Sequence, residues 1–138
     1  MAFTLHPRLE KGCFDFGKLD NCRVLLKNNA TFPWFIIVPE VDDSITELHK
    51  LEAHDFAAVS FVVRQMSAFV DAYFHPDKIN VASIGNQVSQ LHIHIVARFE
   101  SDPAWPGVVW ASDAKKPYEP EQAARINAAY NGVFDQKD

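Results

Sequence analysis

The sequence predicts an α+β fold, in which an antiparallel β-sheet with meander connections carries one long helix on one face and a short helix at its C-terminal end. Two pairs of short β-prone runs predict the sheet, because consecutive strands joined by short turns pair antiparallel. A long segment with apolar residues at helical spacing separates the two pairs. Neither a repeat nor a Gly/Ser-rich linker divides the 138 residues, so we expect a single domain over 1–138. Its core should span about 3–112, and a helical tail over about 118–134 should pack peripherally.

The first predicted hairpin joins two apolar runs. The run CRVLLK at 22–27 is β-prone and ends at Asn28 and Asn29, since asparagine tolerates left-handed turn geometry. The run WFIIV at 34–38 predicts the second strand, which ends at Pro39 because proline cannot donate a ladder hydrogen bond. The two strands should pair around the loop between them.

A long helix is predicted from Ile45 to Phe74. Ser44 and Glu47 have the spacing of a capping box, in which each side chain bonds a backbone donor at the helix start. Pro76 then ends the helical pattern. Apolar residues step by three and four through Val59, Val62, Met66, Phe69 and Tyr73. The helix should therefore lay this stripe across one face of the sheet.

The second predicted hairpin joins residues 78–84 to residues 91–99. The run KINVASI alternates as a strand does and stops at Gly85, and a polar turn then leads into the run LHIHIVARF. A short strand is expected at Val108–Trp110, after a stretch rich in Pro, Gly and Trp. Helical spacing between Pro120 and Val133 predicts the C-terminal helix.

Composition excludes several classes of protein. With 48% hydrophobic residues, eleven Phe and three Trp, the chain is unlike a disordered protein. The net charge is −5 and the basic residues form no run, so we expect no nucleic-acid polymer as a partner. No stretch approaches the roughly 20 apolar residues of a membrane span, and no secretory signal is recognisable, so we expect a cytoplasmic protein. Cys13 and Cys22 form no metal-binding motif, and two reduced thiols or one disulfide remain alternatives.

The strand at 91–99 should place polar side chains together on one face. Successive residues of a strand point to opposite faces, so the aliphatic residues at positions 91, 93 and 95 should enter the core. Gln90, His92 and His94 should then project together from the other face. Imidazole can act near neutral pH as a nucleophile, a general acid or a phosphate donor, so this row is a candidate site.

Three interpretations fit this polar row. The histidines are incidental on a half-exposed strand, or they bind zinc, or His92 is a nucleophile in nucleotidyl transfer. A zinc site needs a third ligand, and none stands at a recognised spacing, so we expect no metal and no cofactor. Nucleotidyl transfer needs donors for the phosphate, and such side chains stand just upstream at Asn80, Asn86 and Gln87.

The segment 86–98 (NQVSQLHIHIVAR) resembles the signature of the histidine-triad superfamily, His-φ-His-φ-His-φ-φ, where φ is apolar. The runs LLKN at 25–28 and FPWFIIVP at 32–39 are similar to the ribose loop and the central strand of that family. A Phe-Pro-Trp run before this strand is typical of a bacterial subgroup, and in this chain Gln stands in place of the first His. The resemblance covers roughly residues 3–110 and implies the histidine-triad fold.

The resemblance implies a role for each polar side chain. His92 holds the position of the family's nucleophile, which attacks the α-phosphorus and forms a nucleotidyl-histidine that water then opens. His94 holds the position of the third histidine, which donates to a phosphate oxygen. Gln90 replaces the first histidine, which orients the others; its amide keeps hydrogen bonding but cannot become cationic. The candidate nucleotide-binding residues are Asn28 at the ribose position, Asn80 and Gln87 at phosphate positions, and Asn86 beside them.

We therefore expect a hydrolase or transferase acting on a purine nucleotide conjugate, of the dinucleoside polyphosphate or nucleoside phosphoramidate type. The alternative, which Gln90 favours, is a nucleotide-binding regulatory or scaffold protein with vestigial activity. Phe3 and Leu25 are candidates for contact with the base, although both also suit a core. The resemblance further implies a homodimer, to which a strand edge and the Trp105/Trp110 region can contribute if these rings do not pack within the chain.

Overall fold

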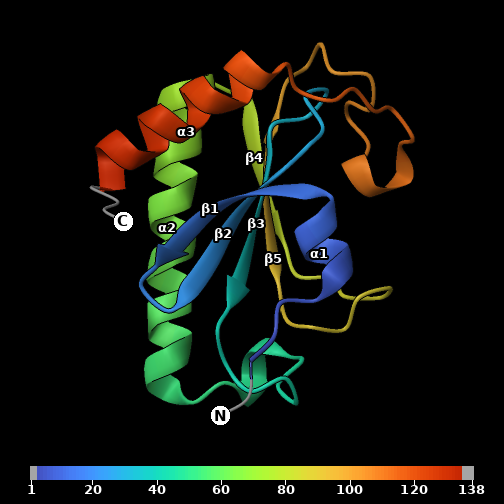
Figure 1. Ribbon diagram of the computed structural model, residues 1–138. Helices are drawn as coiled ribbons and strands as arrows, with labels where there is room; N and C mark the ends of the chain where they lie inside the picture. The colour runs from blue at the N-terminus through green and yellow to red at the C-terminus, as the bar shows by residue number, and fades with distance from the viewer. Residues whose placement is uncertain (1–2, 135–138) are drawn as a thin grey trace.

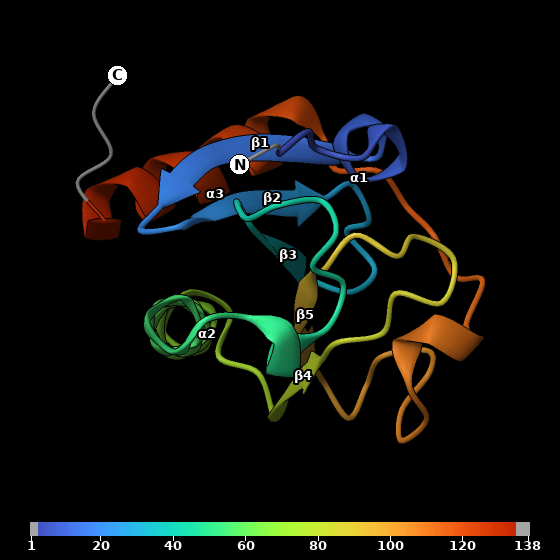
Figure 2. The same cartoon turned by 90° about the horizontal axis from the view of Figure 1, so that it is seen from below.

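A computed structural model describes residues 3–134 and contains a five-stranded antiparallel sheet with a long helix and a C-terminal helix on one face (Figures 1 and 2). The α+β fold predicted from the sequence is confirmed. The two ends of the predicted domain, residues 1–2 and 135–138, lie outside the described residues. The strands are β1 (Cys13–Leu19), β2 (Cys22–Lys27), β3 (Trp34–Pro39), β4 (Lys78–Ala82) and β5 (Ile93–Arg98).

Both predicted hairpins form. β2 pairs antiparallel with β3, with Leu25 opposite Ile36, and β4 pairs antiparallel with β5. The strand order is β1-β2-β3-β5-β4, so β5 rather than β4 lies beside β3. In this pairing Ile36 stands opposite His94. The strand that carries the histidines therefore lies inside the sheet and not at its edge.

The N-terminal part of the sheet was not predicted from the sequence. A short helix, α1 (Pro7–Lys11), leads into β1, which pairs with β2. The register of β1 shifts between Asp15 and Lys18, and Gly17 there has a φ of 90°, which favours glycine. This irregularity interrupts the alternation of apolar and polar residues in the run CFDFGKL, so the run lacks the strict two-residue period that predicts a strand.

The long helix α2 (Ala53–Phe74) ends where the sequence predicts but starts later. The prediction of a helix from Ile45 with a Ser44/Glu47 capping box is wrong, because Ser44 N–H instead donates to the Asp42 carboxylate. A 3₁₀ turn, η1 (Leu48–Lys50), follows before α2 begins. The segment between β3 and α2 crosses the end of the sheet, and only then does α2 run along the face of the sheet (Figure 1). The predicted stripe is buried at Val59, Val62, Met66 and Phe69, whereas Tyr73 is 36% exposed.

Two predictions for the C-terminal third have different outcomes. The strand expected at Val108–Trp110 is wrong, since this stretch forms the 3₁₀ helix η2 (Val109–Ala111), whose backbone bonds stay local. The helix predicted from Pro120 to Val133 is confirmed as α3 (Pro120–Phe134). It packs more deeply than a peripheral tail, because Tyr130 is fully buried with its ring 5.3 Å from that of Phe16.

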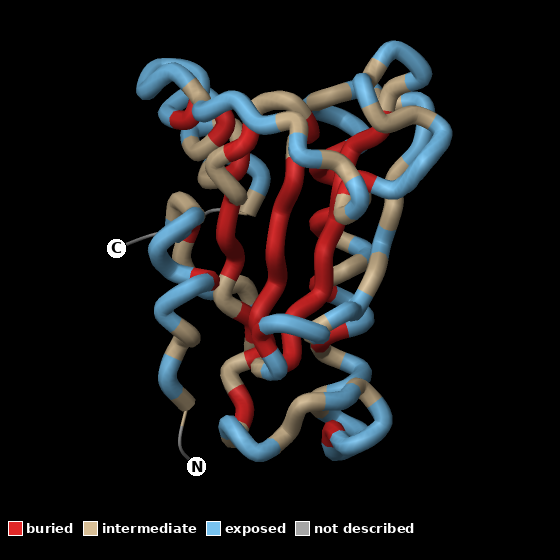
Figure 3. The backbone as a smooth tube through the Cα atoms, turned by 90° about the vertical axis from the view of Figure 1, so that its right-hand side faces the viewer, coloured by how far each residue is buried: buried red, intermediate tan, exposed pale blue. Residues whose placement is uncertain are grey.

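The central strands β2, β3 and β5 are buried on both faces of the sheet, whereas the edge strands β1 and β4 are partly exposed (Figure 3). One cluster fills the space between the sheet and the two helices α2 and α3, and takes Ile93 and Ile95 as predicted. A second cluster covers the opposite face, where α1, the loop 83–92 and η2 pack on residues such as Trp34, Ile36 and Val96. No helix between residues 3 and 134 is long and apolar enough to span a bilayer. The second face, which the alternation predicted to be polar, is thus largely enclosed.

A buried ion pair fastens the segment after β5. Arg98 is 2% exposed and donates from Nε and Nη2 to the two carboxylate oxygens of Asp102, at 2.9 and 3.1 Å. Its Nη1 donates to Asn80 Oδ1 at 2.9 Å. Asp102 also accepts backbone N–H groups, including those of Phe99 and Trp105. This pair fixes the start of the loop that carries η2 back over the sheet.

We expect Asp102→Ala to destabilise the fold by about 3–5 kcal/mol, because it leaves the Arg98 guanidinium buried without its counter-charge. The free energy of urea unfolding measures this.

Burial alone would raise the pKa of Asp102, but the bonds from Arg98 and from backbone N–H groups hold it at about 2. The stabilisation is therefore complete above the ordinary pKa of 3.8 and is lost as the pH falls toward 2. An Asp102→Ala protein that unfolds like the wild type would contradict this account.

Candidate active site

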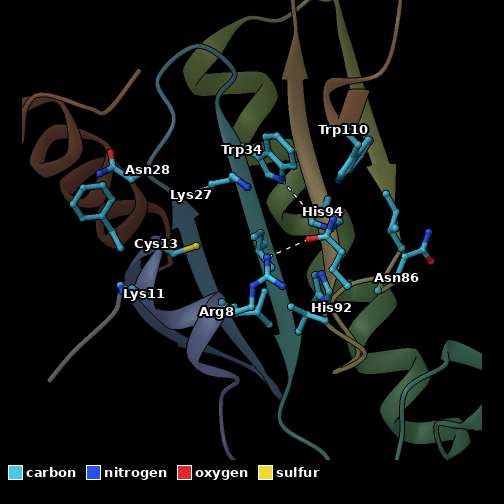
Figure 4. A pocket seen from close by; sticks show the side chains of 18 of the residues that line it. Arg8, Lys11, Cys13, Lys27, Asn28, Trp34, Asn86, His92, His94 and Trp110 are labelled. Atoms are coloured by element: carbon cyan, nitrogen blue, oxygen red, sulfur yellow. Dashed lines mark hydrogen bonds between the residues drawn. The ribbon is translucent and has the colours of Figure 1, made fainter. Parts of the chain in front are cut away.

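A cavity of about 780 Å³ opens on the second face of the sheet (Figure 4). Its floor is formed by Trp34 and Ile36 of β3, by His94 of β5 and by His92 directly before β5. α1 and the start of β1 form one wall, the loop 83–92 forms another, and Trp110 of η2 closes a third side. Elements from four distant parts of the sequence thus meet around the two histidines.

His92 is held by a backbone carbonyl. It directly precedes β5, is 6% exposed, and its Nδ1 lies 2.6 Å from the carbonyl oxygen of Gln90. A carbonyl oxygen only accepts, so Nδ1 must carry the hydrogen. The lone pair of the neutral ring therefore lies on Nε2. His92 is prepared to attack an electrophile with that atom.

His94 is held by a donor instead. The indole N–H of Trp34 donates to its Nδ1 at 2.9 Å, and Trp34 itself is 5% exposed. Nδ1 is therefore the acceptor, and in the neutral ring the hydrogen lies on Nε2. The ring of Trp110 packs edge-on against His94, with the centroids 5.1 Å apart, and restricts its rotation further. His94 is prepared to donate a hydrogen bond.

The two imidazoles are neighbours in complementary states. Their ring centroids are 4.8 Å apart, with the planes inclined at 72°. One offers a nucleophilic nitrogen and the other an N–H donor, which is the pair of functions required to attack a phosphorus atom and to stabilise the charge on its oxygens. The two rings are not bonded to each other; the Gln90 carbonyl fixes the orientation of one and the Trp34 indole that of the other.

Burial keeps both rings neutral. Desolvation lowers the pKa of His92, and the charges of His6 and Lys27 lower it further, against an opposing effect of the bond to the Gln90 carbonyl. Desolvation, followed by the effects of His92 and Lys27, lowers the pKa of His94 to about 3. Near neutral pH each ring is therefore uncharged, and the tautomers deduced from the hydrogen bonds apply.

Positive charge surrounds the cavity although the protein is acidic overall. Four cationic side chains are found among the described lining residues, and none of those residues is Asp or Glu: Arg8, Lys11, Lys27 and Lys115. Lys27 lies with Nζ 4.4 Å from the centroid of the Trp34 ring, next to the histidines. Arg8 donates to Gln87 Oε1 at 3.2 Å across the opening. The basic residues that look scattered in the sequence thus converge around a site for an anion.

The structure brings most of the predicted site residues to this cavity. His92, His94, Asn28, Asn86 and Gln87 line it. The Oδ1 of Asn28 accepts from Tyr118 N–H at 2.8 Å, which fixes the orientation of its amide. The side chain of the neighbouring Asn29 does not line this cavity and bonds to backbone groups, among them Ala114 C=O and Lys116 N–H.

Two predicted residues do not reach the cavity. Asn80 is not among its lining residues; it stands opposite Val96, and its Oδ1 accepts from Arg98 at the other end of β5 from His92. The side chain of Gln90 turns away from His92 toward the N-terminal segment. Residue 90 precedes β5 by three positions, so strand alternation does not govern its side chain.

Other residues differ in role from the sequence expectation. Phe3 and Leu25 do not line the cavity; Leu25 is 1% exposed and belongs to the second core cluster. Trp110 packs within the chain, 5.5 Å from Trp34, and Trp105 lies over Arg98. The apolar side chains that do line the cavity include Leu9, Phe14, Ile84 and Val88.

Sequence reasoning missed the contribution of α1 and the donor role of Trp34. The Phe-Pro-Trp run marks Trp34, but its partner lies 60 residues away and has no local signal. Both cysteines are free thiols, Cys13 beside the cavity and Cys22 in the core, so the disulfide alternative is not formed. Between residues 3 and 134, no group of three His, Cys, Asp or Glu side chains is placed to hold a metal ion.

Comparison with known proteins identifies close structural relatives. A histidine triad protein from Marinobacter aquaeolei VT8 is 39% identical with a TM-score of 0.91, over 97% of each chain. One from Sinorhizobium meliloti 1021 is 37% identical with a TM-score of 0.88, over 92% of this chain and 93% of that one. One from Bradyrhizobium japonicum is 30% identical with a TM-score of 0.93, over 97% and 99%.

The family assignment rests on sequence as well as on structure. No curated protein matches the chain significantly in sequence. The family model described as HIT domain matches residues 8–101, which is more than half of the chain and includes the cavity floor. Together with the bacterial relatives at 30–39% identity, this match shows that the chain belongs to the HIT domain family of histidine triad proteins.

Proposed function

We propose that the cavity binds a purine nucleotide conjugate and that His92 attacks its α-phosphorus, so that the protein is a nucleotide hydrolase or transferase. The observation that carries this proposal is the opposite hydrogen placement on the two adjacent imidazoles, enforced by the Gln90 carbonyl on His92 and by the Trp34 indole on His94. Membership of the HIT family supports the same reaction class.

The first step exchanges one bond at phosphorus for another. The Nε2 lone pair of His92 forms an N–P bond, and the bond from phosphorus to the leaving group breaks with its electron pair on the leaving group. His94 donates from Nε2 to an oxygen of the same phosphate, where negative charge accumulates. The leaving group takes a proton from water as it departs. The result is a nucleotidyl-histidine on His92.

Water completes the hydrolysis. It attacks the phosphorus of the adduct, the N–P bond breaks with its electrons returning to Nε2, and the proton released by water leaves to solvent. The Gln90 carbonyl stabilises His92 throughout, because Nδ1 keeps its hydrogen in every step. If another acceptor replaces water, the same adduct gives transfer instead of hydrolysis.

Charge and shape define the proposed substrate. Asn28 at one side is suited to the ribose, Asn86 and Gln87 at the other face the phosphates, and the apolar side chains Leu9 and Phe14 are suited to the base. The surrounding cations favour conjugates in which the departing part is itself anionic. Among the two expected classes, this favours dinucleoside polyphosphates over phosphoramidates of cationic amines. The proposal includes the homodimer, for which β4 offers a sheet edge with Val81 49% exposed.

We expect His92→Ala to lower turnover of diadenosine polyphosphates by at least about 10³-fold, because removal of the nucleophile blocks the covalent route. Quenching the wild type during turnover of a radiolabelled substrate and mapping the labelled peptide should locate the nucleotide on His92. His54→Ala is the matched control, since this histidine of α2 is exposed and lies outside the cavity. Undiminished turnover in His92→Ala would refute the catalytic assignment. Binding of AMP without turnover of any conjugate would favour the scaffold alternative.

The pH profile should report a neutral nucleophile. Since burial lowers the pKa of His92 below its ordinary value of 6.5, Nε2 is unprotonated at neutral and mildly acidic pH. We expect kcat/KM to stay level down to pH 6.5 and to fall with a single protonation only below it. The substrate should lack a terminal phosphate monoester, because that group titrates near pH 6 itself. A rate that already falls between pH 8 and 7 would contradict a lowered pKa.

We expect Trp34→Phe to lower kcat by roughly 10-fold or more, because without the indole N–H the tautomer of His94 is no longer fixed. Phenylalanine keeps an aromatic ring at this buried position but a smaller one, a loss of size that the same substitution at Trp110 also makes. The specific readout is the pKa of His94, followed by NMR: it should rise, since Nδ1 becomes open to a proton. Trp110→Phe is the control, because the ring of Trp110 also packs against His94 but its indole N–H does not donate to it. An unchanged pKa of His94 in Trp34→Phe would disprove this role.

A further inference from the structure

Gln90 fastens the N-terminal segment to the loop that precedes β5. Its Oε1 accepts from His6 N–H at 2.8 Å, and its Nε2 donates to Thr4 C=O at 2.8 Å. One carboxamide thus pairs with two backbone groups that flank Leu5, as a neighbouring peptide unit in a sheet does. The contact joins residues more than 80 positions apart in sequence.

Asp43 completes this attachment. Its Oδ1 accepts from Thr4 N–H at 3.2 Å and lies 3.5 Å from Gln90 Nε2. Thr4 is therefore held through both its N–H and its C=O. The bonds involve only the backbone of the segment, so its side chains play no part in them.

The fastened segment leads directly into one wall of the cavity. The side chain of His6 accepts from Arg8 N–H at 3.1 Å and caps α1, and the next residues supply Arg8, Leu9 and Lys11 to the lining. Two of the cavity's four described cations stand on this wall (Figure 4). α1 has only five residues, of which Leu9 alone is buried, so its position depends on how its ends are tied.

The side chain and the backbone of Gln90 do different work. The carbonyl oxygen orients His92, and any residue at position 90 provides a carbonyl. The side chain points to the N-terminal segment and takes no part in holding either imidazole. A substitution of Gln90 therefore removes the attachment of the segment and keeps the carbonyl that orients His92.

We propose that Gln90 is a positioning residue whose carboxamide fixes the N-terminal segment as the cationic wall of the cavity, and that it sets affinity for anionic ligands rather than the rate at His92. This inference rests on the proposed function only for the nature of the ligand. A histidine at position 90 could not replace the amide. A carboxamide presents its donor and acceptor side by side, whereas the two ring nitrogens of imidazole diverge and cannot meet Thr4 C=O and His6 N–H together.

Hydrogen exchange tests the attachment without any nucleotide. In Gln90→His and in Gln90→Glu, the amides of residues 4–12 should exchange roughly 10-fold faster or more. Gln90→His loses the paired hydrogen bonds to Thr4 and His6, and Gln90→Glu loses the bond to Thr4 C=O. Gln90→Glu keeps the shape and the acceptor but removes the donor and places a second carboxylate beside Asp43. Thr4→Ala is the matched control, because it changes the segment and keeps its backbone bonds; its exchange should equal that of the wild type.

Calorimetric binding of AMP tests the consequence for the cavity. Gln90→His should raise the Kd for AMP roughly 10-fold and raise KM for diadenosine triphosphate similarly, while kcat changes less than about 3-fold. Arg8→Ala/Lys11→Ala should raise the Kd to the same extent without faster exchange, because the attachment is intact and only the charges are gone.

The outcomes separate this inference from the proposed function. Equal exchange of residues 4–12 in Gln90→His and the wild type would overturn it, as would an unchanged Kd in Arg8→Ala/Lys11→Ala. A gain in kcat on restoring the histidine would also overturn it, since the position would then serve the chemistry. If the wild type binds no AMP, the proposed function fails, while the exchange measurement still decides whether Gln90 fixes the segment.

Discussion

The site depends on the position of β5 in the interior of the sheet. β5 pairs with β3 on one side and β4 on the other, so its backbone is fixed along both edges. Alternation along it then sends Ile93 and Ile95 into the main core and His94 to the opposite face. Because both faces are covered, the histidines stand in a desolvated cavity and not on an open surface. Topology, more than any local preference, makes two ordinary imidazoles into a site.

Desolvation and surrounding charge act in the same direction on these imidazoles. A cavity lined with cations attracts a phosphate, but a protonated histidine there could not attack it. Burial lowers the pKa of both rings, and Lys27 lowers them further, so this cation favours both the proposed phosphate ligand and the neutral form of His92. The tautomers require separate control, which comes from one acceptor and one donor of the fold. Lys27 thus contributes both to the attraction of an anion and to the neutral state of the rings, whereas other groups set the hydrogen placement.

The sequence predicted what local patterns encode. The two hairpins, the end of α2 and the helix α3 follow from alternation, helical spacing and proline, and the cavity takes in five of the predicted side chains. What could not be predicted involves contacts across the fold. The start of α2 depends on the Asp42 side chain bonding Ser44, β1 is interrupted at Gly17, and Trp34 meets His94 only through strand pairing. The cations of the cavity come from separate elements, so their clustering leaves no run in the sequence.

Gln90 illustrates how a substitution can be misread from a motif alone. In the resemblance to the histidine-triad signature, Gln90 stands where a histidine is expected and so suggests a weakened site, because an amide cannot carry a proton. In the fold, the group that touches His92 at this position is the backbone carbonyl, which every residue has. A side chain at position 90 is therefore free to serve another purpose, and here it bonds Thr4 and His6 instead. A glutamine at position 90 therefore leaves in place the group that orients His92, and it does not argue against the proposed catalysis.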